Sequence, residues 1–388
     1  MRVLYSHRIR SRDGQSVHLE AMVAAWRRAG HDVLVQGPAG FAADGLGGGS
    51  GLVDWVRTRL PGWVGELAEL AYALPAAWAL DRAAAAFQPD FIYERANLFH
   101  LAGSLVARRR GLPLLLEVNA PLAEERAKFS GLSRRWLAAG LEHWVWRRAD
   151  RVLPVTAVLA GHVAAAGVPA GRITVVPNGI DLDEYPPPPP RSPGADIRLG
   201  FIGFVRDWHG MDRVLRAVAA WDGEPPLALT IVGDGPARPG LEALAAELGV
   251  AGQLEFTGLA ARDAVPALIG RFDIAMQPAA VPYACPLKVL EYMAAGRAIV
   301  APDQPNLREL LEDGRSALLF DPADPDAMWQ AVLRLAREPA LRRSLGAEAR
   351  ADITRRGLTW DDHAARVIGF AGEARARPAA APPLRRPA

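Results

Sequence analysis

The segment PYACPLKVLEYMAAGRAIVAP, residues 282–302, places a cation and a carboxylate close together at the start of a predicted helix. Lys288, one of only two lysines among the 45 basic residues, lies three positions before Glu291, so their side chains share a helix face. Pro286 suits the first helical position, which leaves the backbone amides of Leu287 and Lys288 free to donate. A lysine beside free amides suits phosphate, and a carboxylate suits two vicinal ribose hydroxyls. A surface ion pair is the alternative at this spacing.

Two further loops that follow predicted strands carry residues able to bind an anion. Arg206 and His209 come after the strand Ile197–Gly203 and directly before a helix, where cations, free amides and the helix dipole act together. After the first strand, Gly14 precedes a helix and lets a phosphate or sugar approach free amides. Solvated loop residues and an ordinary turn glycine are the alternatives at these two places.

Short apolar or β-branched runs alternate with helical patterns throughout the chain, which predicts parallel sheets with helices on both faces. In the first half we expect strands at Arg2–Ser6, Asp32–Gln36, Phe91–Glu94, Leu112–Val118, Arg151–Val155 and Ile173–Val176. In the second half we expect them at Ile197–Gly203, Leu227–Val232, Gln253–Thr257, Asp273–Gln277, Ala298–Ala301 and Ala317–Phe320. Ligands of such sheets bind beyond the carboxyl ends of the strands, where the loops above lie.

A chain of 388 residues suits two domains of roughly 170–190 residues each. Five consecutive prolines, Pro186–Pro190, cannot lie inside a helix or a central strand, so they predict a stiff linker over 183–195. The expected division is a first domain over 1–182 and a second over 196–356. The Pro/Ala/Arg-rich end, 374–388, is expected to be a disordered tail.

Composition and charge exclude several classes of protein. A net charge of +2 gives no case for nucleic-acid binding, and the single cysteine, Cys285, allows no internal disulfide and fits a reducing compartment. The charged N-terminal residues predict no signal peptide, and the apolar run Leu70–Leu80 is too short to span a bilayer. The first loop lacks the G-x-G-x-x-G of a nicotinamide enzyme. We therefore expect a cytoplasmic protein that is not integral to a membrane.

Several motifs follow one another in the order and spacing of a known family. They are VVPNGIDLDEY, GFVRDWHG, IVGDGP, EFTGLAARDAVP, PLKVLEYMAAGRAIVAP and LLEDGRSALLFDPADPDA. Each is weak alone, but together they resemble the family 4 retaining glycosyltransferases over nearly the whole chain. The resemblance implies the α/β GT-B fold, with two doubly wound Rossmann-like domains facing each other across a cleft. It also implies that a helix over 357–373, which contains TWDDHAARVIGF, crosses back onto the first domain.

The resemblance also implies roles for individual residues. Glu291 corresponds to the second glutamate of the family's Glu-x7-Glu motif, which holds the donor ribose, while Gly258 would border the base. Arg206 and His209 occupy the loop whose cations bind the donor diphosphate in relatives. The implied catalytic residues are Asn119, Arg206, His209 and Lys288. The implied donor-binding residues are Gly14, Gln15, Gly203, Gly258, Tyr283, Pro286, Leu287, Lys288 and Glu291.

Four positions depart from the family pattern. Tyr283 stands where the first glutamate of Glu-x7-Glu is expected, and His209 stands where relatives usually carry a lysine. The arginine of relatives sits closer to the strand than Arg206. In EVNAP, Asn119 takes the place near the reacting centre where many members have a histidine. These changes leave the identity of the catalytic groups open.

The activity that the resemblance implies is transfer of a sugar from a nucleotide-sugar donor to a glycan or glycolipid acceptor, with retention of the anomeric configuration. Helix amides and cations, instead of a bound metal, would stabilise the leaving diphosphate. The eight histidines and single cysteine show no metal-ligand spacing, and no cofactor is expected beside the donor substrate. Two alternatives stay open: a nucleotide-sugar 2-epimerase of the same fold, and an inactive nucleotide-sugar-binding protein.

Aromatic residues of the first half predict a peripheral contact with the inner face of the cell membrane. Six of the eleven tryptophans fall between Trp55 and Trp146, and RRWLAAGLEHWVWRRADR combines three of them with a cluster of arginines. On a helix one broad apolar face would comprise Trp136, Leu137, Leu141, Trp144 and Val145. Indole rings and arginines favour the headgroup region of an anionic bilayer. Packing of these tryptophans against their own sheet is the alternative.

Overall fold

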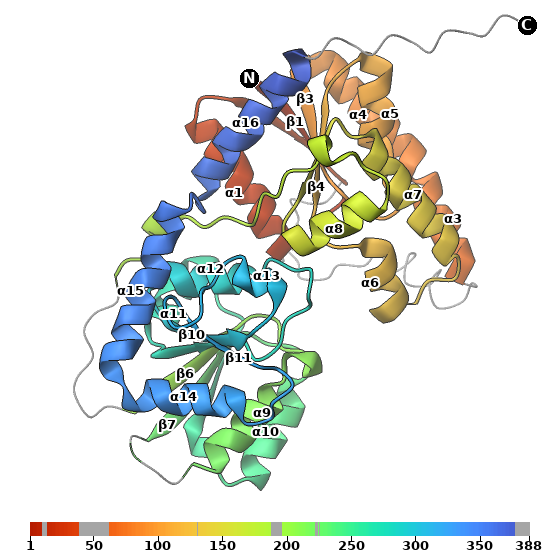
Figure 1. Ribbon diagram of the computed structural model, residues 1–388. Coiled ribbons are helices and arrows are strands. Elements are labelled where there is room, and N and C mark those ends of the chain that lie inside the picture. The colour runs from red at the N-terminus through yellow and green to blue at the C-terminus, as the bar shows by residue number, and fades with distance from the viewer. Residues whose placement is uncertain are drawn as a thin grey trace, which may run out of the picture. The chain divides into compact units, whose positions relative to one another are not determined.

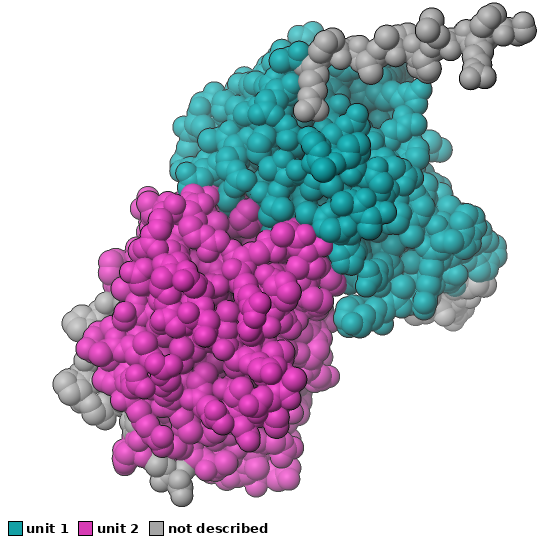
Figure 2. Space-filling view, viewed as in Figure 1, with its two compact units in different colours: residues 1–155, 159–176, 361–388 teal, residues 156–158, 177–360 magenta. Residues whose placement is uncertain are grey.

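The computed structural model describes residues 1–9, 14–38, 62–129, 131–187, 196–221, 224 and 226–376. The chain forms two compact units, which Figure 2 shows in different colours. The first unit comprises residues 1–155, 159–176 and 361 onward, and the second comprises residues 156–158 and 177–360. Each unit contains one parallel sheet with helices packed on its faces (Figure 1).

The first unit is built on a five-stranded sheet in the order β2-β1-β3-β4-β5. The strands are β1 (Arg2–Ser6), β2 (Asp32–Gln36), β3 (Phe91–Arg95), β4 (Leu114–Val118) and β5 (Arg151–Pro154). The helices are α1 (Gly14–Arg28), α3 (Gly62–Ala71), α4 (Ala73–Phe87), α5 (Ala102–Arg110), α6 (Leu122–Phe129), α7 (Arg135–Arg148), α8 (Ala157–Ala165) and α16 (Trp360–Ala376). Every side chain of β3 and β4 is buried, as expected of central parallel strands covered on both faces.

The second unit has a six-stranded sheet in the order β11-β10-β9-β6-β7-β8. The strands are β6 (Ile197–Ile202), β7 (Leu227–Val232), β8 (Leu254–Gly258), β9 (Ile274–Met276), β10 (Ala298–Pro302) and β11 (Leu318–Phe320). The helices are α9 (Met211–Ala219), α10 (Arg238–Glu247), α11 (Val265–Gly270), α12 (Leu287–Ala294), α13 (Pro305–Arg308), α14 (Ala327–Arg337) and α15 (Pro339–Arg355). The sheet and helices α9, α10 and α14 enclose one apolar core.

Eleven of the twelve expected strands are present, with ends that differ by two residues at most. The strand expected at Ile173–Val176 is wrong. That segment makes one isolated bridge, in which the amides of Thr174 and Val176 donate to carbonyls of β5. Pro177 follows immediately and has no amide hydrogen, so it cannot extend the ladder. The first sheet therefore has five strands within the described residues.

Two expected segments lie largely outside the described residues. The structure describes Pro186 and Pro187 but not residues 188–195, so the stiff linker stays a prediction. Residues 377–388 of the expected tail are likewise outside the described ranges, and α16 continues to Ala376. Within those ranges, no helix has both the length and the apolar character needed to cross a bilayer.

Helix α15 fixes the position of α12, the helix that carries Lys288 and Glu291. Gly346 of α15 lies against the backbone at Gly296, where a Cβ on Gly346 would stand 2.2 Å from a carbonyl oxygen. Arg350, one turn further along α15, donates to the carbonyl of Ala294. Because a side chain at position 346 would collide with backbone that cannot move aside, this close approach requires glycine.

Replacing Gly346 with alanine should therefore destabilise the second unit. Overpacking costs about 1–3 kcal/mol, more than the roughly 0.5–1 kcal/mol that alanine gains over glycine inside a helix. Gly369→Ala in α16 is the matched control, because a Cβ there meets no atom within 4 Å. Urea unfolding of both variants measures the difference, and equal stability would show that the contact does not constrain α15.

Candidate functional site

Three glycines mark the carboxyl ends of neighbouring strands in the second sheet. Gly203 follows β6, Gly233 follows β7 and Gly258 ends β8, with φ angles of +135°, +133° and +70°. The Gly203 amide donates to the Val232 carbonyl at 2.9 Å, and Gly233 forms a bridge with Gly258. A Cβ on Gly233 would stand 2.2 Å from the Gly203 carbonyl oxygen. The strand ends thus present bare backbone in conformations that only glycine adopts without strain.

The ammonium of Lys288 lies beside this glycine edge. The Lys288 Nζ is 3.9 Å from the centroid of the Phe201 ring. A Cβ on Gly203 would stand 3.0 Å from the same Nζ. Among the described residues Lys288 has no ion-pair or hydrogen-bond partner, so the alternative of a surface pair with Glu291 is wrong. Burial lowers the pKa of Lys288 to about 7, although Glu291 acts in the opposite direction. The lysine is a cation without a counterion, next to exposed backbone.

Glu291 is held by residues from two other segments. Its side chain is buried, and Arg262 Nη1 donates to Oε1 at 3.3 Å. The Tyr185 hydroxyl is a second hydrogen-bond partner. Burial raises the pKa of Glu291, and Arg262 and Tyr185 oppose that change. Arg262 and Tyr185 lie within the EFTGLAARDAVP and VVPNGIDLDEY segments, but no local pattern assigns them to the glutamate.

The start of α12 differs by one residue from the expectation. Pro286 is the residue before the helix and Leu287 is its first residue. Within the described chain the amides of Leu287 and Lys288 have no acceptor, as predicted for the start of a helix. The Tyr292 hydroxyl accepts from the Ile202 amide at 3.0 Å and faces the Met276 carbonyl at 3.4 Å. This tyrosine fastens α12 to the ends of β6 and β9.

The loop before α12 is held by polar side chains. Asn178 Nδ2 donates to the Cys285 carbonyl at 2.6 Å, and Thr156 Oγ1 donates to the Tyr283 carbonyl at 2.9 Å. Asn306 Nδ2 donates to the Val281 and Ala284 carbonyls at 3.1 and 2.8 Å. The loop backbone around Tyr283 is therefore fixed by bonds to its carbonyls.

His209 is not the cation that the sequence predicts. Its ring is buried, and Nδ1 accepts from the Arg206 amide at 3.1 Å, which places the ring hydrogen on Nε2. Burial lowers the pKa of His209 to about 3, and the charges of Lys288 and Arg206 add to the effect. Arg206 is exposed, with its guanidinium 5.0 Å from the Phe204 ring centroid. This turn offers one cation and one neutral imidazole N–H donor.

In the first unit, Glu117 near the end of β4 is the centre of a polar cluster. The carboxylate is 2% exposed. It accepts or pairs with Tyr5, His18, Tyr93, Arg95 and Asn119. Burial alone would raise the pKa of Glu117, but Arg95 and His18 hold it well below the ordinary value. Glu117 is therefore an ionised group that orients Asn119, the expected catalytic residue.

A second carboxylate, Glu94, lies buried on β3. It accepts from the Ser6 hydroxyl at 2.9 Å and from the Gly103 amide at 2.7 Å, and His100 Nε2 is 3.3 Å away. Sequence analysis singled out neither Glu94 nor Glu117. The available signal was a charged residue inside the apolar strands FIYER and LLLEV. Helix α1 begins at Gly14, and the side chain of Gln15 lies outside the described residues.

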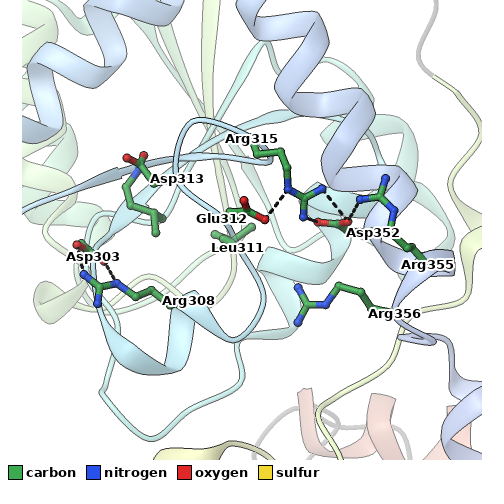
Figure 3. Close-up of a pocket in the computed structure, with 10 residues that line it drawn as sticks. Asp303, Arg308, Leu311, Glu312, Asp313, Arg315, Asp352, Arg355 and Arg356 are labelled. Atoms are coloured by element: carbon green, nitrogen blue, oxygen red, sulfur yellow. Dashed lines mark hydrogen bonds and ion pairs between the residues drawn. The ribbon is translucent and has the colours of Figure 1, made fainter.

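The second unit has an open hollow of about 710 Å³ that the sequence did not predict. Figure 3 shows the side chains that line it. Four arginines line it, and three of them pair with carboxylates: Arg308 pairs with Asp303, and Arg315 and Arg355 both pair with buried Asp352. Arg356 donates to the Leu310 carbonyl at 2.8 Å. The hollow lies where α15 meets the loop after α13, and ion pairs link the two segments there. Among the described residues no group of three histidine, cysteine or acidic side chains is placed to hold a metal.

Comparison with known proteins matches both units to glycosyltransferase families. Residues 12–184 match the family model "Glycosyltransferase Family 4", and residues 196–338 match "Glycosyl transferases group 1". The chain is 30% identical to the D-inositol 3-phosphate glycosyltransferase of Thermomonospora curvata over 321 residues, which cover 74% of this chain and 73% of the relative. It is 28% identical to the 2-deoxystreptamine glucosyltransferase of Streptomyces kanamyceticus, covering 62% of this chain and 65% of the relative.

Solved structures share the fold at low sequence identity. The Anabaena HepE protein in complex with UDP matches with a TM-score of 0.74 and 18% identity, covering 96% of this chain and all of that one. Sucrose-phosphate synthase from Thermosynechococcus elongatus matches with a TM-score of 0.75 and 16% identity, covering 96% and 99%. Two parallel-sheet units of this kind are the Rossmann-like domains of the GT-B fold. The chain is a glycosyltransferase that belongs to family 4.

Proposed function

We propose that this protein transfers a sugar from a nucleotide-sugar donor to a glycan or lipid-linked acceptor, with retention of the anomeric configuration and without a metal ion. The observation that carries the proposal is the unpaired ammonium of Lys288 beside the glycine edge of the second sheet. Lys288 is half-buried. A half-buried cation without a counterion is costly, and an anionic ligand removes that cost. The diphosphate of a nucleotide sugar supplies such an anion.

Two groups near Lys288 complete a donor site. Glu291, fixed by Arg262 and Tyr185, takes the ribose hydroxyls. The free amides of Leu287 and Lys288 at the start of α12 face negative charge favourably. Gly203 and Gly258 leave room for the donor to approach the strand ends closely. Tyr283, in the position of the missing glutamate, contributes its fixed backbone to the same loop.

The leaving diphosphate gains charge as the glycosidic bond breaks. Arg206 and Lys288 supply positive charge, and His209 supplies a neutral N–H donor from Nε2. Preorganised donors of this kind stabilise developing charge without moving during the reaction. These groups together take the part that a bound metal plays in other phosphate sites, which supports a metal-independent reaction.

In the first unit, Asn119 is the residue we assign to the reacting centre, and Glu117 is its positioning residue. Asn119 Nδ2 donates to Glu117, and Arg95 and His18 keep that carboxylate charged. A carboxylate with a strongly lowered pKa and this many donors is a poor nucleophile. This supports attack by the acceptor on the face that the diphosphate leaves, instead of a covalent route through Glu117.

The relatives' names guide the choice of test compounds. D-inositol 3-phosphate, 2-deoxystreptamine and phosphatidylinositol monomannoside are acceptors named for three of them. We expect UDP-, GDP- or ADP-sugars to raise the melting temperature, because a ligand that binds only the folded state stabilises it. With one of these acceptors, we expect a product of unchanged anomeric configuration by NMR, formed equally well in EDTA.

Each part of the proposal has its own contrary outcome. The absence of a thermal shift with any nucleotide sugar would overturn donor binding. Conversion of the donor alone into its 2-epimer would identify the epimerase. Loss of turnover in EDTA, restored by magnesium or manganese, would overturn metal independence, and an inverted product would overturn retention.

The titration of Lys288 gives the donor site a specific dependence on pH. With a pKa of about 7, the ammonium of the free protein loses its proton as pH rises to 9, so donor affinity should fall, approaching tenfold per pH unit. Lys288→Arg keeps its charge and should abolish this dependence. Lys128→Arg, at the only other lysine, is the control. Calorimetry with a nucleotide sugar measures both, and an unchanged pH profile in Lys288→Arg would exclude the ammonium from the diphosphate site.

Replacing Glu117 with glutamine should damage the first unit while donor affinity is retained. The change leaves Arg95 buried without a counterion, which costs about 3–5 kcal/mol. The folded pKa of Glu117 lies below its unfolded value of about 4.3. Its stabilisation is therefore complete above that value and is lost as pH falls, so the variant should approach the parent in acid.

Glu142→Gln is the matched control for this substitution. Glu142 is partly buried in the same unit, but it accepts only from backbone amides, and burial raises its pKa to about 7. It should therefore lose little stability on conversion to the amide. Urea unfolding at pH 7 and at about pH 2.5 tests the pair, because the stabilisation by Glu117 is lost only below its unfolded pKa of about 4.3. Equal losses at pH 7 in both variants would contradict the role of the Glu117–Arg95 pair.

A further inference from the structure

Helices α3 and α4 carry an exposed surface that is entirely apolar over five turns. Between residues 62 and 81 the exposed positions are Gly62, Trp63, Leu67, Ala68, Ala71, Leu74, Pro75 and Trp78. The charged residues of this stretch, Glu66, Glu69 and Asp81, are buried or half-buried. Helices on the surface of soluble domains ordinarily place charged residues on their outer face. This surface has the opposite character.

The largest exposed side chains form one stripe. Trp63, Leu67, Leu74 and Trp78 are 42%, 37%, 70% and 63% exposed. Trp63 and Leu67 are four residues apart on α3, and Leu74 and Trp78 are four residues apart on α4, so each pair shares one face of its helix. We call these four residues, two tryptophans and two leucines, the aromatic stripe.

Neighbouring helices extend the stripe with further exposed aromatic residues. Trp136 of α7 is 75% exposed and Phe129 of α6 is 55% exposed. Glu66 of α3 accepts from the amides of Ser133 and Arg134 just before α7, and Glu69 pairs with Arg126 of α6 at 2.7 Å. Figure 1 shows α3 and α7 running side by side.

The apolar face expected for α7 is only partly at the surface. Val145 is buried, as is the third tryptophan of that segment, Trp146, while Trp136 stands out in solvent. Their packing against the core agrees with the alternative considered for this segment. The exposed aromatic surface of the first unit is therefore centred on α3 and α4, with α7 contributing one end.

Three of the four exposed aromatic residues, Trp63, Trp78 and Phe129, have a cation over the ring. Arg134 lies 5.3 Å from the Trp63 centroid, and Arg82 lies 4.8 Å from the Trp78 centroid. Lys128 lies 5.1 Å from the centroid of Phe129. Asp81, which precedes Arg82 on α4, is already paired with Arg110 at 2.6 Å. The margin of the stripe is thus positively charged.

We propose that the aromatic stripe and its cations dock on the surface of an anionic lipid bilayer. Indole rings and arginines together occupy the headgroup region, where the ring meets the acyl boundary and the guanidinium meets phosphate. Docking of two copies through this surface would bring like charges together around the apolar centre, which opposes association. The docking surface does not involve the donor site, so it stands or falls separately from the proposed function.

Co-sedimentation of the full chain with vesicles tests the proposal. The chain should sediment with vesicles of phosphatidylglycerol and phosphatidylcholine in low salt, and should be released as sodium chloride rises to about 0.5 M, because screening weakens the attraction. Leu74→Ser and Trp78→Ser should each weaken binding roughly tenfold, since each removes one buried apolar side chain from the contact. Arg82→Glu should also weaken vesicle binding, and the loss should be larger in low salt than in high salt.

The matched control is Leu259→Ser in the second unit, where a leucine 62% exposed corresponds to Leu74 at 70%. It should bind vesicles like the parent. Melting temperatures of all variants establish that they are folded. Failure of the parent to bind anionic vesicles in low salt would overturn the proposal, as would equal loss in Leu259→Ser. A dimer by light scattering that Leu74→Ser dissociates, without vesicle binding, would assign the surface to self-association instead.

Discussion

The second unit depends on an ammonium group that the fold keeps apart from the nearest carboxylate. Lys288 and Glu291 are one helical turn apart, and in water they would form a weak pair. Here Glu291 is bound by Arg262 and Tyr185, while Lys288 lies over the Phe201 ring beside Gly203. The two charged groups therefore do not neutralise each other, and each can bind a different part of a ligand. Contacts of Tyr292, Gly346 and Arg350 hold α12, which carries both residues, against the rest of the unit.

The first unit contains a buried charge that, unlike Lys288, has its partners. Glu117 is buried within the core, yet it remains ionised because Arg95, His18 and three further donors surround it. A carboxylate so well bound holds its neighbours in place and does not itself react. The two units thus contain complementary kinds of charge. The buried carboxylate of Glu117 has its partners, and the half-buried ammonium of Lys288 lacks one and is suited to bind an anion.

Arginine is the usual cation of this chain, and its use explains the rest of the surface. Three of the four arginines of the hollow in Figure 3 pair with acidic groups, with Asp352 shared between two of them. The arginines around the aromatic stripe are different, because they lie over rings and not beside carboxylates. Arginine therefore links segments through ion pairs in the hollow and leaves positive charge available around the aromatic stripe.

The sequence by itself predicted the alternation of strands and helices, eleven strand positions, and the segment that carries Lys288 and Glu291. These features are encoded by local patterns: apolar runs that fit buried parallel strands, and a proline and a glycine that bound a helix. The failure at Ile173–Val176 has the same local origin, since a β-branched run cannot reveal that Pro177 ends the pairing.

Only the tertiary structure decided the partners and charge states of the site. Arg262 reaches Glu291 from 29 residues away in the chain, and Glu117 meets Tyr5 from 112 residues away. No pattern within one segment records such meetings. His209 is neutral because its ring is buried and accepts from a backbone amide, which depends on how the turn folds. The tertiary structure also decided which faces of α3 and α4 are exposed, because a helix rich in apolar residues on every side does not indicate which of its faces the domain covers.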